Sequence, residues 1–94
     1  MMDGDRSISK AWHIDAAVDE HEKRTRAQVR LSWQGNQVVG VGLARLDPAD
    51  EPVAAIGDEL ALARALSDLA HQLLELTVTD IEAATRKPVT KLNP

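Results

Sequence analysis

The sequence predicts an α+β fold in which a three-stranded antiparallel meander packs on C-terminal helices, in the order β-β-β-α-α. Three observations predict it. Two stretches alternate strictly between apolar and polar residues, which is the period of a half-buried strand. A third, β-branched stretch follows a glycine-containing turn, and a longer stretch then repeats its apolar residues every three or four positions. In a chain of 94 residues this describes a single domain at 10–86, between a flexible leader at 1–9 and an extended tail at 87–94.

Each of the first two strands has one apolar face. The apolar residues are Trp12, Ile14, Ala16 and Val18 in the first strand and Ala27, Val29, Leu31 and Trp33 in the second. For both apolar faces to lie on the same side of the sheet, the numbers of paired residues must sum to about 43 or 45. A sum of 45 places Trp12 opposite Trp33, with both rings buried, and sets acids against arginines on the other face as Asp15–Arg30 and Asp19–Arg26. Such cross-strand charge pairs stabilise a sheet by about 0.2–1 kcal/mol each.

The turn into the third strand is predicted at Gly35-Asn36, because both residue types tolerate positive φ. A two-residue turn there pairs Trp33 with Val38. The core face of the third strand then carries Gly40, Gly42 and Ala44, and its other face carries Val39, Val41 and Leu43. The glycines let a helix approach closely, and the exposed apolar row favours a homodimer interface. A bulge in the turn would shift the register by one residue and bury that row instead.

A proline-containing loop is predicted at 46–53, followed by a helix that begins near Gly57-Asp58-Glu59. The apolar face of the helix comprises Leu62, Ala63, Leu66, Leu69, Ala70, Leu73 and Leu74, and the solvent face carries Arg64, Asp68, His71 and Glu75. The segment Thr77-Val78-Thr79-Asp80 predicts a break, with a short second helix continuing to about Arg86.

Little in the sequence indicates catalysis. Without cysteine there is no thiolate metal site or thiol nucleophile, and His13, His21 and His71 share no metal-ligand spacing. Gly40-Val41-Gly42 lacks the third glycine of a phosphate-binding loop, because Arg45 occupies its position. We therefore predict a protein that is not an enzyme and uses no metal, cofactor or small-molecule substrate.

No apolar run approaches the roughly 20 residues of a membrane span, and residues 1–10 lack the apolar core of a signal peptide. We expect a cytoplasmic protein with no membrane partner.

The charge is distributed unevenly along the chain. Residues 46–85 hold one basic and nine acidic residues, whereas residues 1–45 are nearly balanced. A surface for RNA or another partner would therefore use residues of the N-terminal half or the tail, which are Arg24, Arg26, Arg30, Arg86 and Lys87. The alternative reading of the three strand arginines is a salt-bridge ladder with Asp15 and Asp19.

Three stretches together resemble a known family: EHEKRTRA at 20–27, VGVGLARLDPAD at 39–50, and IGDEL at 56–60 with ALSDL at 65–69. They are similar to a small actinobacterial family of unknown function with a dsRBD-like fold. A dormancy-associated mycobacterial member of that family is likened to ribosome hibernation-promoting factors. The resemblance covers about residues 11–90. It implies an antiparallel sheet packed on C-terminal helices and a homodimer, and it transfers no functional residue.

Two functions follow as hypotheses. The first is a stress- or dormancy-associated regulatory protein that acts by binding, at the ribosome or a ribosomal protein. The second is an acidic homodimeric protein–protein interaction module that does not contact RNA. A double-stranded-RNA-binding domain places lysines at the start of its last helix, and the acidic Gly57-Asp58-Glu59 would repel phosphates there. An RNA contact would therefore use the arginine face or the tail.

Overall fold

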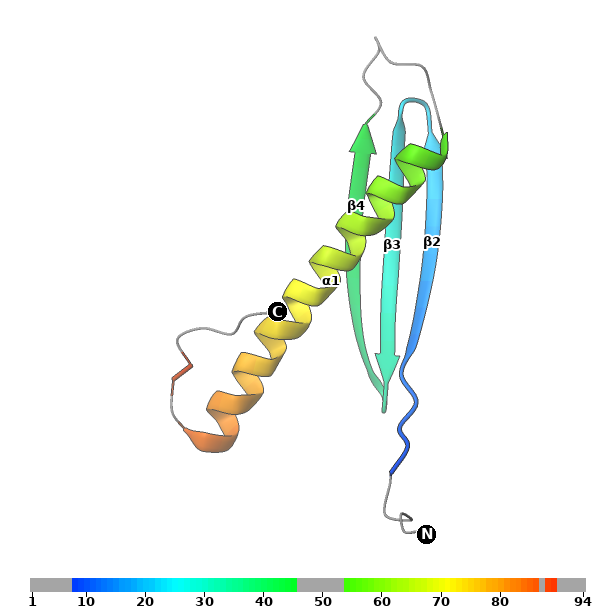
Figure 1. Ribbon diagram of the computed structural model, residues 1–94. Coiled ribbons are helices and arrows are strands. Elements are labelled where there is room, and N and C mark those ends of the chain that lie inside the picture. Colours follow the sequence, from blue (N-terminus) through cyan, green and yellow to red (C-terminus); the bar gives the residue numbers. More distant parts are fainter. Residues whose placement is uncertain (1–7, 46–53, 87, 90–94) are drawn as a thin grey trace.

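The computed structural model describes residues 8–45, 54–86 and 88–89. The strands β2 (His13–His21), β3 (Arg24–Trp33) and β4 (Asn36–Arg45) form one antiparallel sheet in the order β2-β3-β4. A single helix, α1 (Ala54–Thr85), lies diagonally across one face of this sheet (Figure 1). The predicted α+β meander is thus confirmed. The predicted loop at 46–53 and most of the predicted leader and tail lie outside the described residues.

The first hairpin has the register that the charge pairs favour. Asp15 pairs with Arg30 and Asp19 pairs with Arg26, so paired residue numbers sum to 45. The rings of Trp12 and Trp33 stack with centroids 4.6 Å apart and planes 8° apart. Their predicted burial is wrong, because Trp12 is 46% exposed and Trp33 is half-buried. The pair lies near the end of the sheet, where Trp33 packs against the core and Trp12 stacks on Trp33.

The second hairpin turns one residue earlier than predicted. Trp33 pairs with Asn36, so the loop is Gln34-Gly35 and the register differs from the predicted one by two residues. Both loop residues have positive φ, 42° at Gln34 and 80° at Gly35, as a two-residue hairpin turn of type I′ requires. A shift of two preserves the faces of a strand. The predicted distribution of β4 side chains, with Gly40, Gly42 and Ala44 facing the helix and Val39, Val41 and Leu43 facing away, is therefore confirmed.

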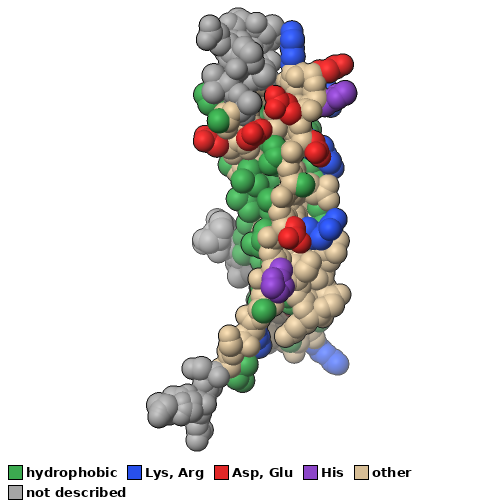
Figure 2. Space-filling view, turned by 90° about the vertical axis from the view of Figure 1, so that its right-hand side faces the viewer, with side chains coloured by type: hydrophobic (Ala, Val, Ile, Leu, Met, Phe, Trp, Pro, Cys, Tyr) green, Lys and Arg blue, Asp and Glu red, His purple; other side chains and the backbone are tan. Residues whose placement is uncertain are grey.

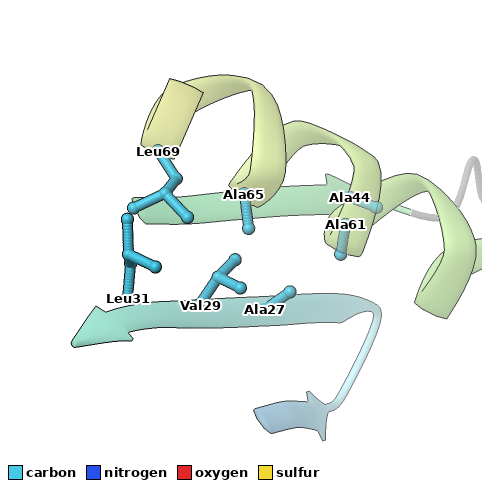
Figure 3. Packing of buried hydrophobic residues seen from close by; sticks show 7 residues of the cluster. All are labelled: Ala27, Val29, Leu31, Ala44, Ala61, Ala65 and Leu69. Atoms are coloured by element: carbon cyan, nitrogen blue, oxygen red, sulfur yellow. The ribbon is translucent and has the colours of Figure 1, made fainter. Parts of the chain in front are cut away.

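The glycines of β4 set how closely α1 approaches the sheet. A Cβ on Gly42 would meet the backbone of Ala61 and Ala65, and one on Gly40 would lie 2.7 Å from the backbone nitrogen of Leu69. The core between the two layers consists of small and aliphatic side chains (Figure 3), namely Ala27, Val29, Leu31, Ala44, Ala61, Ala65 and Leu69. Helix and strand backbones thus pack against each other almost directly.

This close approach also explains why the predicted apolar face of the helix is displaced. The buried apolar side chains of the helix are Ala61, Ala65 and Leu69, spaced four apart, and this stripe lies over Gly42 and Gly40 of β4. The leucines that the periodicity placed at the centre lie to one side of this stripe. Leu62 is half-buried and Leu66 is 41% exposed.

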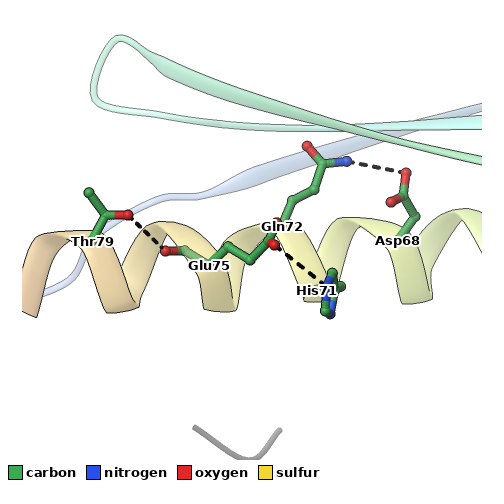
Figure 4. Close-up of polar contacts among 5 residues, drawn as sticks. All are labelled: Asp68, His71, Gln72, Glu75 and Thr79. Carbon is green, nitrogen blue, oxygen red and sulfur yellow. Dashed lines mark hydrogen bonds and ion pairs between the residues drawn. The ribbon is translucent and has the colours of Figure 1, made fainter. Parts of the chain in front are cut away.

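The predicted break in the helix does not occur, and α1 runs without interruption to Thr85. Thr77 and Thr79 do not start a new helix. The Thr77 hydroxyl donates to the carbonyl of Leu73 at 2.8 Å. The Thr79 hydroxyl donates to the carbonyl of Glu75 at 3.1 Å, one turn back (Figure 4). This internal bonding lets the two threonines remain inside a helix.

Polar side chains of α1 bond to the outer edge of β4. The Arg64 guanidinium donates to the carbonyl of Leu43 at 2.7 Å, and the Gln72 amide donates to the carbonyl of Val39 at 2.7 Å. Between them the Asp68 carboxylate accepts from the N–H of Val41 at 2.9 Å. Sequence periodicity placed Arg64 and Asp68 on the solvent face; the structure places them over the strand edge. They occupy backbone groups that would otherwise be free to pair with another strand.

We expect Asp68→Ala to lower the free energy of unfolding by about 1 kcal/mol, because the Val41 N–H loses a charged acceptor and Gln72 loses a partner. Urea unfolding measures the change. Glu75→Ala is the matched control, since this exposed carboxylate contacts His71 on the same helix and does not reach the sheet. The control should stay within about 0.5 kcal/mol of the parent protein. Equal losses in both variants would show that the bonds to β4 contribute nothing.

Within the described part of the chain, no helix is both long enough and apolar enough to cross a membrane.

Candidate functional site

The face of the sheet away from α1, called the outer face here, carries three rows of different character. The β2 row holds acids and histidines, the β3 row holds the arginines, and the β4 row holds the valines and leucine. Basic side chains gather along this side of the molecule, on the right of Figure 2. The helix on the opposite side is acidic, since Arg64 stands among six carboxylates between Ala54 and Thr85. The basic charge of the described residues is thus concentrated on the sheet.

One end of the outer face forms an open cleft of about 640 Å³ beside the β2–β3 hairpin. Strand pairing brings its walls together, because His21 pairs with Arg24 and Arg24 pairs with Arg45. Four basic residues, two acids and one histidine line the cleft, which are Lys23, Arg24, Arg26, Arg45, Asp19, Glu22 and His21. All of them are exposed. The cleft therefore offers a net positive, solvent-filled surface.

The opposition of Arg24 and Arg45 is the most unusual feature of this cleft. Like charges directly opposite each other on neighbouring strands destabilise a sheet. Among the described residues, neither arginine has a carboxylate within the 4.0 Å of an ion pair. Two arginines at paired positions that line one cleft and have no carboxylate partner are suited to bind an oxyanion such as a phosphate.

The aspartates of β2 do not neutralise the arginine row. Asp15 and Asp19 lie opposite Arg30 and Arg26 in register, as the salt-bridge reading requires. In the described part of the protein, however, no ion pair joins them, and the Arg26 guanidinium instead donates to the Gln28 amide oxygen at 3.4 Å. The register of the predicted ladder is confirmed, and its ion pairs are not formed.

The structure brings together some of the predicted contact residues and separates others. Arg24 and Arg26 line the cleft, and Arg30 lies further along the same strand. Arg86 follows the C-terminal end of α1, far from the hairpin end of the sheet (Figure 1). Lys87 lies outside the described residues. The arginines of β3 and the tail therefore do not form one surface within this chain.

The predicted interface row lies on the outer face beside the arginines. Val39 is half-buried, Val41 is 37% exposed and Leu43 is 45% exposed. The exposure that motivated the interface hypothesis is present, and the role of this row as an interface stays a prediction.

Sequence reasoning placed Lys23 beside the arginine row but missed Arg45 as a member of the cleft. Arg45 is remote from Arg24 in the chain and joins it only through the register of the second hairpin. Lys23 lies in the tight β2–β3 loop beside Glu22, whose φ is 55°. The run of charges from Asp19 to Arg24 was the available signal.

The histidines do not form a metal site in the structure. His13 and His21 occupy opposite ends of β2, while His71 lies on α1 with its Nε2 3.7 Å from a carboxylate oxygen of Glu75 (Figure 4). Across the described residues, no group of three or more His, Asp or Glu side chains could hold a metal ion.

These features define a small α+β protein with an open, charged surface. The chain belongs to the Rv2632c-like family, whose model matches residues 10–90. The curated relative "Uncharacterized protein Rv2632c" of Mycobacterium tuberculosis strain H37Rv is 67% identical over 86 residues, 92% of each chain. "Uncharacterized protein MT1780" of M. tuberculosis strain CDC 1551 is 53% identical over 89 residues, 93% of this chain and 95% of the relative.

The fold also matches a solved structure. The crystal structure of Rv2632c superposes with a TM-score of 0.80 at 66% sequence identity, over 88% of this chain and 99% of that one. The family is thus a small mycobacterial one whose function is not established, and its α+β fold agrees with that of the chain described above.

Proposed function

We propose that this chain is a non-enzymatic binding protein that contacts the phosphate backbone of RNA, at the ribosome, through the basic cleft of its outer face. The observation that carries the proposal is the opposition of Arg24 and Arg45 without a neutralising carboxylate. A folded protein that keeps two like charges in this arrangement gains stability when an oxyanion binds between them. Phosphate contacts of this kind supply most of the sequence-independent affinity for nucleic acid.

Three further features support the same surface. Lys23 and Arg26 line the same cleft, which adds two further cations to the opposed arginines. The helix does not cover this side of the sheet, and the acidic helix lies on the other side, so the two faces differ in charge. A stress- or dormancy-linked regulatory role, which the family resemblance implies, would be exerted through this contact.

Co-sedimentation of the purified protein with ribosomes, at low and at physiological salt, tests the proposal. We expect stoichiometric pelleting at low salt that declines steeply as salt rises, because phosphate contacts release condensed counterions. Absence of the protein from the ribosome pellet at both salt concentrations would refute it.

A second candidate function rests on the acidic face of α1. This face would suit a protein partner with a basic surface, and the chain would then be an acidic homodimeric interaction module that does not contact RNA. Ribosomes stripped of protein separate the two functions. Binding to bare ribosomal RNA supports the cleft, whereas binding that requires ribosomal proteins and persists in high salt supports the helix.

A further inference from the structure

The two tryptophans form an aromatic pair at the end of the sheet opposite the cleft. Their rings are nearly parallel, with planes 8° apart and centroids 4.6 Å apart. The sequence has two tryptophans and no phenylalanine or tyrosine. Every large aromatic ring of the chain therefore belongs to this one stack.

Only one member of the stack is anchored in the core. Trp33 is half-buried, packs against the core and covers one face of the Trp12 ring. Trp12 remains 46% exposed, so its other ring face is open to solvent. The helix does not cover this face, because α1 crosses β4 and leaves the sheet before the end that carries the β3–β4 turn (Figure 1). A further planar ring can therefore add to the stack on Trp12.

The stack adjoins an open hollow of about 360 Å³ at the β3–β4 turn. Trp33 belongs to both, because it also lines the hollow. The other lining residues are Ala11, His13, Ser32, Gln34, Gly35, Asn36 and Gln37. None of these described residues is acidic, and alanine is the only apolar side chain among them. The hollow therefore suits a polar planar group better than an apolar peptide.

The amides of this hollow are available for binding. Among the described residues, none accepts from or donates to the side-chain amides of Gln34, Asn36 and Gln37. An amide presents a donor and an acceptor next to each other, which is the pattern found along the edges of nucleic-acid bases. Unpaired bases also stack on tryptophan rings in sites that bind single strands.

The arginine row of β3 joins this end of the sheet to the cleft. Arg24, Arg26 and Arg30 are all exposed on the outer face, and β3 extends about 33 Å over its ten residues. Ser32 follows Arg30 on the same face and lines the hollow. A phosphate backbone that follows the arginines from the cleft therefore leads to the hollow and the ring stack.

We propose that Trp12 is a stacking platform for an unpaired base of single-stranded RNA, and that the amides of the β3–β4 turn bind an adjacent nucleotide. The choice of RNA rests on the proposed function, but these residues lie outside the cleft. The cleft supplies charge, which any RNA satisfies. The platform requires a base that is free to stack, so the protein would prefer single-stranded to fully paired RNA.

Intrinsic fluorescence tests the platform directly, because Trp12 and Trp33 are the only tryptophans. The probe is a uridine octamer, a length within the roughly 4–16 nucleotides of single-strand sites. The control is a ribose-phosphate octamer without bases. We expect the uridine octamer to quench the emission, because a stacked base quenches an indole ring, and the control to bind without quenching. Equal quenching by both octamers, or none by the uridine octamer, would overturn the platform.

Substitutions at Trp12 separate stacking from packing. We expect Trp12→Leu, which stays apolar but lacks the ring, to bind a labelled uridine octamer about tenfold more weakly, and Trp12→Phe to keep most of the affinity. The slope of log affinity against log salt should not change in either variant, because no phosphate contact is lost. Fluorescence anisotropy measures both quantities. Unaltered binding by Trp12→Leu, or an equal loss in Trp12→Phe, would show that the ring only packs on Trp33.

The platform and the cleft fail separately. Arg24→Ala combined with Arg45→Ala should weaken binding of both octamers, yet a saturating concentration of the uridine octamer should still quench the emission. Quenching that survives in this variant supports the platform even where the ribosome assay refutes the cleft. Equal affinity of the parent protein for the two octamers would refute the platform and leave the phosphate contact of the cleft in place.

Discussion

Gly42→Val is expected to destabilise this protein more than any other single substitution considered. A Cβ at this position would lie against the backbone oxygen of Ala61 and the backbone nitrogen of Ala65. Backbone atoms cannot rotate away as a side chain can, so the whole helix would have to lift from β4. Lifting it would separate the core and pull Arg64, Asp68 and Gln72 from the strand edge.

We expect the loss in the free energy of unfolding to exceed about 3 kcal/mol, the upper end of ordinary overpacking. Circular dichroism during thermal and urea unfolding measures it. Gly57→Ala is the control, since its added Cβ would contact the Thr25 hydroxyl at 3.1 Å and that side chain can shift. Alanine also favours the helix there by about 1 kcal/mol relative to glycine. A Gly42→Val protein as stable as the control would mean that helix and sheet are not in direct backbone contact.

The second large effect is expected on binding. Arg24→Ala combined with Arg45→Ala should reduce the affinity for ribosomes by roughly tenfold or more at low salt, and lower the slope of log affinity against log salt by about 2. The matched control removes two positive charges outside the cleft, as Lys10→Ala with Arg86→Ala. Fluorescence anisotropy with labelled protein at several salt concentrations provides both quantities.

The same double variant should lose affinity for ribosomes without losing thermal stability. Removing the two opposed arginines relieves cross-strand repulsion, so the double variant is expected to unfold at the same or a higher temperature than the parent protein. A binding loss that came with a comparable loss of stability would indicate damage to the sheet. Equal weakening by the cleft and control pairs would show that net charge, and not the cleft, governs binding.

Much of the sheet could be predicted from the sequence because a strand repeats every two residues. The alternation fixed which side chains share a face, and the acid–arginine pairs selected the first register correctly. The second register could not be fixed in this way, because Gly35 is acceptable at either position of a two-residue turn. The position of this turn determines which residue faces Arg24 in the cleft. The predicted turn sets Asp47 opposite Arg24, whereas the observed turn sets Arg45 there.

The helix was harder to predict in detail. Hydrophobic periodicity weights leucine above alanine, yet the helix residues that lie closest to Gly42 of β4 are Ala61 and Ala65. The glycines of β4 and the helix are each evident in the sequence, but the face that the helix buries depends on how the two pack together. The bonds of Arg64, Asp68 and Gln72 to β4 could not be foreseen, since they depend on which strand is the edge and on where the helix crosses it.

Because α1 is longer than the sheet, its first turns pack on the strands and its last turns lie beyond them. A helix of 32 residues extends about 48 Å, whereas each ten-residue strand beneath it extends about 33 Å. The core contacts of the helix end near Leu69 and Leu73, and the later turns project beyond the sheet (Figure 1). Residues up to Leu73 can unwind only when the whole domain opens, while the last three turns are free to fray on their own. The projecting turns can therefore unwind without any loss of the fold that holds the cleft.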